Sequence, residues 1–171
     1  MATTTRSKTN SAARTRYEDD VFTWAGEQIE LLRAGQLSEV DALNIAEELS
    51  DVANSIRSSL ESAIAVLTMH LLKWDHQPTR RSRIWELTIA EQRRQIRRLL
   101  KRNPGLKSVL AEGIEEGYAD GRGRALIETK LARNLLPEAC PYLFDEMMHR
   151  TIEFEDRPAR GRKPRKGQQS K

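Results

Sequence analysis

The longest uninterrupted amphipathic run of the chain extends from Ser55 to Trp74 and contains neither proline nor glycine. Its apolar residues recur in steps of three and four, at Ile56, Leu60, Ala63, Leu67, Leu71 and Trp74. This spacing predicts an α-helix with one buried face. His70 lies at the edge of that face, one turn before Trp74, where a half-buried imidazole is expected. The other helices are expected to pack around this one.

Two shorter amphipathic segments precede this run. The first is expected to form a helix that begins at Tyr17 and stops at Gly35, because glycine suits a helix C-terminus. The second is expected to begin with Ser38 as its N-cap, followed three residues later by Asp41. This helix either continues into the long run or bends at residues 50–55, where Ser, Asp and Asn cluster. The cluster favours a bend or short break.

Pro78 ends the long run, and Ser82 is expected to cap the next helix. Apolar residues from Trp85 to Leu99 indicate its buried side. Its outer face is strongly basic and carries Arg93, Arg94, Arg97, Arg98, Lys101 and Arg102.

A further helix is expected to start at Asn103-Pro104, because Asn caps helices and Pro suits their first turn. Within it, glycines recur at Gly113, Gly117, Gly121 and Gly123. Such small residues indicate either the close approach of a neighbouring helix or a break near Gly121. A short terminal helix is expected from Leu143 to about Arg150.

No stretch alternates apolar and polar residues with the period of two that a half-buried strand requires. The pattern therefore predicts an all-α fold, an up-and-down bundle of five to six helices. The bundle domain is expected over residues 17–150. Basic tails over residues 1–16 and 151–171 have little to bury and are expected to be disordered.

A chain of 171 residues is long enough for one domain with a hydrophobic core. No apolar stretch approaches the roughly 18 residues of a membrane span, and the N-terminal residues lack the apolar core of a secretory signal. The single cysteine, Cys140, excludes an intramolecular disulfide and favours a reducing compartment. The expected location is cytoplasmic, with no membrane partner.

The formal net charge of +4 conceals an asymmetry. Residues 1–16 carry four basic residues and residues 157–171 carry seven, without any acid, which leaves about −7 for residues 17–156. The high isoelectric point is therefore a property of the tails. Overall charge gives no reason to expect nucleic-acid binding by the bundle itself.

Several short motifs follow one another over about residues 15–149. They are Tyr17 with Asp20, Trp24 and Gln28; Leu31 to Gly35; Asn44 to Leu49; His70 to Trp74; Trp85 with Gln92-Arg93; Asn103 to Leu106; Tyr118; Leu136-Pro137; and Cys140-Pro141-Tyr142. In this order they resemble a bacterial family of uncharacterised helical proteins, catalogued as domain of unknown function twenty-nine. Gly105 departs from the Ser expected there, which affects at most a helix cap. The resemblance implies an all-helical fold and brings no activity, substrate or catalytic residue.

Five polar residues lie at or beside expected core positions on different expected helices: Gln28, Glu47, His70, Gln92 and Tyr118. Helical bundles build metal and catalytic sites from inward-pointing side chains of facing helices. An enzyme or metal-binding site around Glu47 and His70 is therefore one interpretation, with His70 as a ligand or general base. The favoured interpretation is a buried network in which these groups satisfy one another. No metal and no cofactor are predicted.

Two other catalytic hypotheses are weaker. A magnesium-dependent nucleotide pyrophosphohydrolase would need two acidic helix motifs. Glu47, Glu48 and Asp51 supply one, but the next helix offers only Glu61. The acids that could stand in for the second motif are typical of a solvated helix face: Glu112, Glu115, Glu116 and Asp120. Cys140 has no histidine close in sequence to activate it and is expected to be structural.

Basic residues crowd the C-terminal tail, at Arg157, Arg160, Arg162, Lys163, Arg165 and Lys166. Arg160-Gly161-Arg162 resembles the AT-hook of minor-groove binders, except that Lys163 stands where Pro should follow. Attraction to phosphates without groove specificity is therefore expected. The sequence predicts an interaction module that engages a protein partner or self-associates, with a tail that contacts nucleic acid or another acidic surface.

Overall fold

The structure is a computed structural model, and it describes residues 14–155. These residues form five α-helices and four short 3-10 segments, and none of them lies in a β-strand. The all-α prediction is therefore confirmed. The described residues divide into two compact units, with the boundary between Asn54 and Ser55. Most of the two predicted disordered tails falls outside the described residues.

In the first unit, α1 (Val21–Arg33) begins later than predicted. Asp20 has an extended backbone, and its carboxylate accepts a hydrogen bond from the Thr23 amide at 3.1 Å. The predicted start at Tyr17 is wrong, because an Asp N-cap three residues further on satisfies the first amide groups of the helix. Gly35 has a φ of +70°, so the predicted glycine stop is confirmed.

The start of α2 (Ala42–His76) also differs from the prediction. Residues Leu37–Glu39 form a short 3-10 segment, η1, and Ser38 lies inside it. The cap is Asp41, whose carboxylate accepts from the Asn44 amide at 3.3 Å. The sequence predicts Asp41 three residues after the cap, but Asp41 is the residue directly before the first residue of α2.

A bend or break over residues 50–55 is also wrong, because α2 is one continuous helix. The hydroxyl of Ser50 donates to the carbonyl of Ala46 at 2.8 Å, and that of Ser59 donates to Ser55 at 2.9 Å. These bonds to the carbonyl four residues earlier satisfy the polar side chains inside the helix. With no Pro or Gly from Ala42 to His76, nothing interrupts the backbone ladder.

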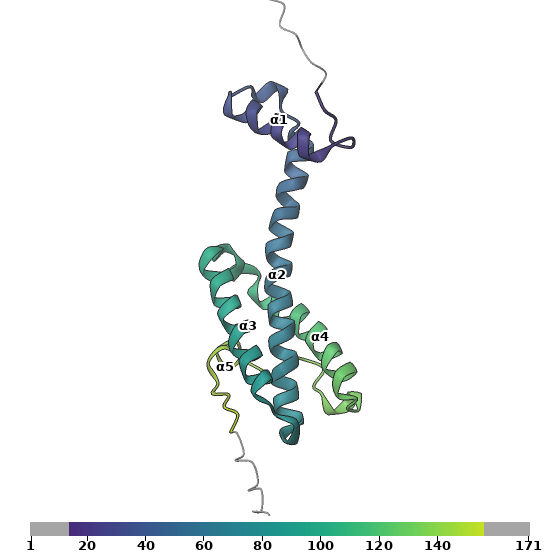
Figure 1. Cartoon of the computed structure of the whole chain (residues 1–171), viewed down its shortest axis with the longest axis vertical. Coiled ribbons are helices and arrows are strands. Elements are labelled where there is room, and N and C mark those ends of the chain that lie inside the picture. Colours follow the sequence, from purple (N-terminus) through teal and green to yellow (C-terminus); the bar gives the residue numbers. More distant parts are fainter. Residues whose placement is uncertain (1–13, 156–171) are drawn as a thin grey trace, which may run out of the picture. The chain divides into compact units, whose positions relative to one another are not determined.

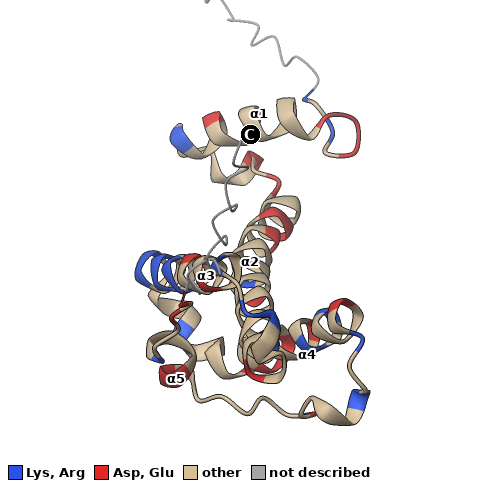
Figure 2. Cartoon of the chain, turned by 60° about the horizontal axis from the view of Figure 1, so that its bottom comes forward, with Lys and Arg blue, Asp and Glu red and all other residues tan. Residues whose placement is uncertain are grey.

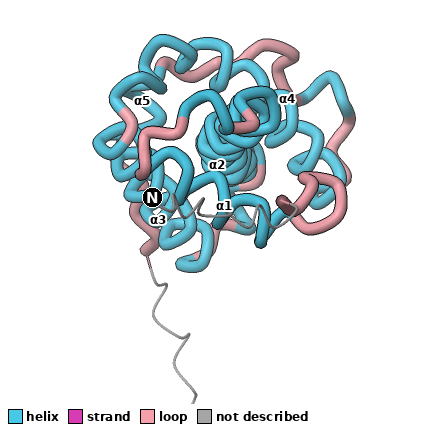
Figure 3. The backbone as a smooth tube through the Cα atoms, turned by 90° about the horizontal axis from the view of Figure 1, so that it is seen from above, coloured by secondary structure: helices cyan, strands magenta, loops and turns pink. Residues whose placement is uncertain are grey.

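The second unit is built around the C-terminal part of α2. The helices α3 (Arg83–Arg102), α4 (Leu110–Thr129) and α5 (Phe144–His149) lie around it (Figures 1 and 3). Its core includes Leu60, Leu67 and Leu71 of α2 with Ile96 of α3 and Met147 of α5, all almost fully buried. The predicted end of α2 before Pro78 and the Ser82 cap of α3 are confirmed, the latter by the Trp85 amide, which donates to Ser82 Oγ at 3.4 Å.

Close approach of α4 to α2 explains the glycines of α4. A Cβ built at Gly117 would lie 2.8 Å from the carbonyl oxygen of Glu61, and one at Gly121 would clash with the Ala65 carbonyl and the Thr68 hydroxyl. Since α4 is continuous through Gly121, close approach is confirmed and a break there is excluded. The predicted helix start at Asn103-Pro104 is wrong, because Pro104–Val109 form a 3-10 segment, η3, and α4 begins only at Leu110. The Asn103 side chain caps no helix start and donates instead to the Leu99 carbonyl of α3 at 3.2 Å.

Two shorter 3-10 segments complete the connections, η2 (Pro78–Arg80) before α3 and η4 (Arg133–Leu135) after α4. The helix α5 matches the predicted terminal helix to within one residue at each end. None of the helices within residues 14–155 combines the length and the apolar character needed to cross a bilayer.

Candidate functional site

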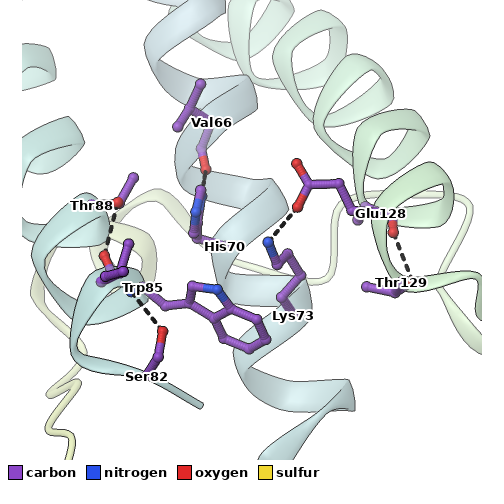
Figure 4. Close-up of polar contacts among 10 residues, drawn as sticks. Val66, His70, Lys73, Ser82, Trp85, Thr88, Glu128 and Thr129 are labelled. Atoms are coloured by element: carbon purple, nitrogen blue, oxygen red, sulfur yellow. Dashed lines mark hydrogen bonds and ion pairs between the residues drawn. The ribbon is translucent and has the colours of Figure 1, made fainter. Parts of the chain in front are cut away.

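His70 lies buried on α2, and its polar contact is with its own helix (Figure 4). Its Nδ1 is 2.8 Å from the carbonyl oxygen of Val66. Burial lowers the pKa of the imidazole, although the Val66 hydrogen bond opposes this. The ring is therefore neutral near pH 7, with the proton on Nδ1, where it can donate to the carbonyl. A buried imidazole held this way packs one layer of the core.

The neighbouring cation, Lys73, is buried too. Its ammonium group donates to Glu128 of α4 and lies 4.6 Å from the ring centroid of Trp85 of α3. Figure 4 shows the lysine between these two helices. A cation over an indole face with a carboxylate partner is stabilised by both groups. Lys73 therefore joins all three long helices of the second unit, a role that the sequence analysis missed.

Two other members of the predicted polar cluster, Gln28 and Tyr118, have backbone partners. Gln28 is buried, and its amide oxygen accepts from the Asp41 backbone at 2.9 Å. Tyr118 is buried on α4 and donates its hydroxyl to the Pro137 carbonyl at 2.6 Å. Glu47 is exposed, and Gln92 is half-buried on α3.

No hydrogen bond joins any two of these five residues, all of which the structure describes. Gln28 and Glu47 belong to the first unit, whereas His70, Gln92 and Tyr118 belong to the second. Within residues 14–155, no three His, Cys, Asp or Glu side chains are grouped so that they could hold a metal ion. The catalytic role of this cluster stays a prediction with no geometric support.

A tighter polar group, unforeseen from the sequence, lies at the C-terminal end of α2. The Asp75 carboxylate accepts from the Tyr142 hydroxyl at 2.8 Å and from the Arg150 guanidinium at 3.0 Å. Burial raises the pKa of the Asp75 carboxyl, but the bonds from Arg150 and Tyr142 outweigh it and hold the pKa below the usual range. Burial and the Asp75 charge raise the pKa of Tyr142. These contacts hold Tyr142 and Arg150 against the C-terminal end of α2.

Cys140 lies beside this group, and its structural role stays a prediction. Its thiol is half-buried and 3.6 Å from the Tyr142 carbonyl. Burial raises the pKa of the thiol, which suppresses the thiolate that a nucleophile requires. A groove of about 560 Å³ lies between α4 and residues 138–144. Tyr118, Cys140 and Tyr142 are among the residues that line it. The hydroxyl groups of both tyrosines are already committed to partners within the fold.

The outer face of α3 is strongly positive (Figure 2). The helix carries seven basic residues against Glu86 and Glu91. Within residues 14–155, four of its exposed cations form no ion pair or hydrogen bond: Arg97, Arg98, Lys101 and Arg102. The prediction that Arg93 belongs to this outer face is wrong, because Arg93 is half-buried and its Nε donates to the Met147 carbonyl of α5 at 2.7 Å. Burial, then Arg97 and Arg150, lower the pKa of Arg93, and its Nη2 is buried without a partner. This face therefore has excess positive charge available for an acidic group.

One edge of this face borders a small groove between α3, η3 and α5. Its volume is about 240 Å³. The cations around it are Arg97, Lys101 and Lys107, and its apolar lining comes from Leu100, Phe144 and Met148. The groove combines positive charge with an apolar floor, which suits an apolar side chain flanked by acids. We call it the α3–α5 groove.

The first unit has the opposite character. Only Trp24, Gln28 and Leu31 are buried among residues 14–54. Eight of its large apolar side chains are exposed: Val21, Phe22, Ile29, Leu32, Leu37, Leu43, Leu49 and Val52. The most exposed are Phe22 at 90% and Leu43 at 85%. An apolar surface of this density on a small unit is typical of an interaction site.

The first unit is also strongly acidic. Residues 14–54 carry ten Asp and Glu against three Arg. Some of these acids serve the fold: Asp41 accepts from the Trp24 indole at 3.3 Å, and Glu48 accepts from Tyr17 at 2.7 Å, which raises the pKa of Tyr17 to about 12. Others, such as Asp19 and Asp51, have no polar partner among residues 14–155.

The comparisons with known proteins agree with the motifs noted in the sequence. The family model described as Domain of unknown function DUF29 matches residues 16–152. No curated protein and no solved structure matches the chain. The family match therefore spans both units, and any role must be inferred from their surfaces.

Proposed function

Because the chain belongs to the family described as Domain of unknown function DUF29, whose description assigns no activity, we propose a function from the surfaces of the molecule. The protein is an interaction module, and its first unit docks a basic amphipathic segment of a protein partner. The observation that carries this proposal is the apolar surface of residues 14–54, where eight large apolar side chains are exposed.

The energetics of the first unit favour a partner. Trp24 and Leu31 are its only buried apolar side chains among the described residues, and domains this small are marginally stable on their own. Covering exposed side chains such as Phe22 and Leu43 would remove apolar surface from water, at roughly 25 cal/mol per Å². A partner that covers them would therefore stabilise the unit as it binds.

The charge of the first unit defines the chemistry of that partner. Its ten acids against three Arg produce a negative field around the apolar surface. A segment with one apolar face and flanking Lys or Arg residues is complementary in both respects. An acidic or phosphate-bearing partner would be repelled.

This proposal can be tested by titrating the full chain into a fluorescently labelled helical peptide built from Leu and Lys in an amphipathic pattern. Binding measured by anisotropy should be salt-sensitive. Phe22→Ser should weaken it by about tenfold or more, because a large aromatic anchor is lost. Asp19→Lys should weaken it as well, through charge repulsion.

Two controls make the result specific. Ile127→Ser removes an exposed apolar side chain from the second unit and should leave binding unchanged. A peptide of the same pattern built from Leu and Glu should not bind the first unit. Equal binding of both peptides, or binding that ignores Phe22→Ser, would contradict the proposal.

The basic tail completes the proposed function. Arg157, Arg160, Arg162, Lys163, Arg165 and Lys166 lie outside the described residues, and the proposal for them rests on their charge. They add salt-sensitive contact with nucleic acid or an acidic surface in the cytoplasm. Deleting residues 157–171 should abolish binding of the full chain to a DNA duplex; unchanged binding would contradict this part.

A further inference from the structure

The α3–α5 groove has the size of a side-chain pocket. Small-molecule sites typically enclose about 300–1,000 Å³, whereas this groove has a volume of about 240 Å³. Its apolar lining, Leu100, Phe144 and Met148, provides contact for one hydrophobic side chain. Arg97, Lys101 and Lys107 add positive charge around that contact. The expected occupant is an apolar residue next to acidic ones.

The same chain contains such a segment in its first unit. Glu18, Asp19 and Asp20 directly precede Val21 and Phe22. Residues 17–19 form a turn, and Phe22 lies in the first turn of α1 with 90% of its surface exposed. Figure 2 shows the acidic turn before α1 in red and the outer turns of α3 in blue. Glu18 pairs with Arg16 at 3.5 Å and Asp20 caps α1, so the segment presents an aromatic ring with Asp19 as its unpaired acid.

We infer that the segment Glu18–Phe22 of one copy of the chain docks in the α3–α5 groove of a second copy. Phe22 enters the apolar lining, and the acids before it face the cations of the groove. This inference rests on the proposed function, since it names the partner of the first unit: α3 is itself a basic amphipathic helix. We choose a second copy as the partner because of charge complementarity. The same sequence contains an acidic first unit and a basic face on α3 whose charges are not neutralised.

The groove fits an acidic polypeptide better than nucleic acid. A phosphate backbone would use Arg97, Lys101 and Lys107 but has no group to cover Leu100 or Met148. The segment Glu18–Phe22 satisfies both requirements at once. Two copies in which each groove receives the segment of the other form a closed pair, with no free groove left for further growth.

The central experiment measures the mass of the full chain over a range of concentrations by sedimentation, at low and at moderate salt. The wild type should form a dimer that weakens as salt rises. Phe22→Ser and Lys101→Glu should each weaken dimerisation by about tenfold or more, since each removes one side of the contact. Both positions are exposed, so circular dichroism should report an unchanged fold.

A charge swap tests the pairing itself. Asp19 and Lys101 have no polar partner within the described residues, so reversing both charges disturbs no other contact. Asp19→Lys alone should weaken dimerisation, and the double variant with Lys101→Glu should recover most of it. As a matched control, Lys130→Glu reverses an exposed charge of the second unit away from the groove and should have no effect.

Three outcomes would overturn the inference. The first is a monomer at every concentration, or a dimer that ignores both Phe22→Ser and Lys101→Glu. The second is a monomer in which Phe22→Ser raises the hydrogen-exchange rate of the groove residues. That result would mean that the segment binds the groove of its own chain. The third is a monomer whose binding to a DNA duplex is lost in Lys101→Glu, which would assign the groove to a polyanion. If the chain stays monomeric while the Leu/Lys peptide still binds the first unit, only this inference fails and the proposed function stands.

Discussion

The two units of this chain differ in whether the apolar residues of α2 are buried or exposed. In the second unit, α2 buries Leu60, Leu67 and Leu71 completely beneath its neighbours. In the first unit, the earlier turns of the same helix leave Leu49 and Val52 more than half exposed. The spacing of apolar residues is helical in both cases. Apolar periodicity therefore predicts the helix, but it does not say whether the apolar face is core or surface.

The difference lies in what is available to cover each part. Gly117 and Gly121 allow α4 to approach α2, and Lys73 connects α2 to both α3 and α4. The first unit has only α1 and η1 beside the start of α2, and hydrogen bonds join Asp41 to Trp24 and Gln28 of α1. The second unit can hold its own core, whereas the first retains a surface that suits a partner.

The largest expected effect compares one leucine from each part of α2. Leu67→Ala should lower the free energy of unfolding by about 2–5 kcal/mol, because it leaves a cavity in a closed core. Leu49→Ala should change it by no more than about 0.5 kcal/mol, because that side chain already faces solvent. Urea unfolding followed by circular dichroism measures both. Equal losses would show that the face carrying Leu49 is covered within the folded chain.

The second prediction tests the close approach of α4 to α2. Gly121→Ala should lower the free energy of unfolding by about 2–3 kcal/mol, because the new Cβ would overlap the Ala65 carbonyl and the helices must separate. Gly123→Ala is the matched control two residues away, where a Cβ meets nothing within 4 Å. It should stabilise the helix by up to about 1 kcal/mol. Thermal unfolding of the two variants should therefore shift in opposite directions.

Helix existence could be predicted from the sequence, whereas helix starts could not. Both Ser38 and Asp41 are competent caps, and the local pattern does not decide between them. The choice depends on Gln28, whose amide oxygen binds the Asp41 backbone from a different helix. Local preference also fails at residues 50–55. Ser and Asn favour turns, yet α2 continues through them, and the Ser50 hydroxyl donates to the Ala46 carbonyl of the same helix.

The candidate site was harder to predict than the fold. Gln28, His70 and Tyr118 do lie buried, as their positions beside the apolar faces indicated. Their partners, however, are backbone groups, and a sequence pattern does not show which backbone groups a fold leaves free. Lys73 was missed because its stabilising groups, Trp85 and Glu128, come from two other helices. The sequence around Lys73 shows only a charged residue between Leu72 and Trp74, both of which are buried in the structure.

The third prediction compares a paired acid of the second unit with an unpaired acid of the first. Asp75→Asn should lower the free energy of unfolding at pH 7 by roughly 1–2 kcal/mol, because Arg150 and Tyr142 lose a charged acceptor. Asp19→Asn should have no measurable effect when the chain is dilute enough to be monomeric. Since the folded-state pKa of Asp75 is lowered, its contribution is present above the unfolded pKa of about 3.9 and is lost as the pH falls through the folded value. The gap between wild type and Asp75→Asn should therefore close in acid; a gap that stays constant to pH 2 would contradict the pairing.

The smallest expected effect is a change in stability near neutral pH, and it should appear only in the second unit. All three histidines lie in the second unit, so the first should keep the same stability from pH 7.5 to 5.5. The second should lose stability as the pH falls below the unfolded histidine pKa of about 6.5, because burial lowers the folded pKa of His70, which faces Lys73 and Glu128. Hydrogen exchange, corrected for the intrinsic rate at each pH, reports the two units separately. His70→Gln should remove the slope in α3 and α4, whereas His76→Gln, an exposed position on the same helix, should retain it. If the stability of α1 depended on pH as steeply as that of α3 and α4, the two units would unfold together. The difference between a buried core and an exposed apolar surface would then not give the two units separate stabilities.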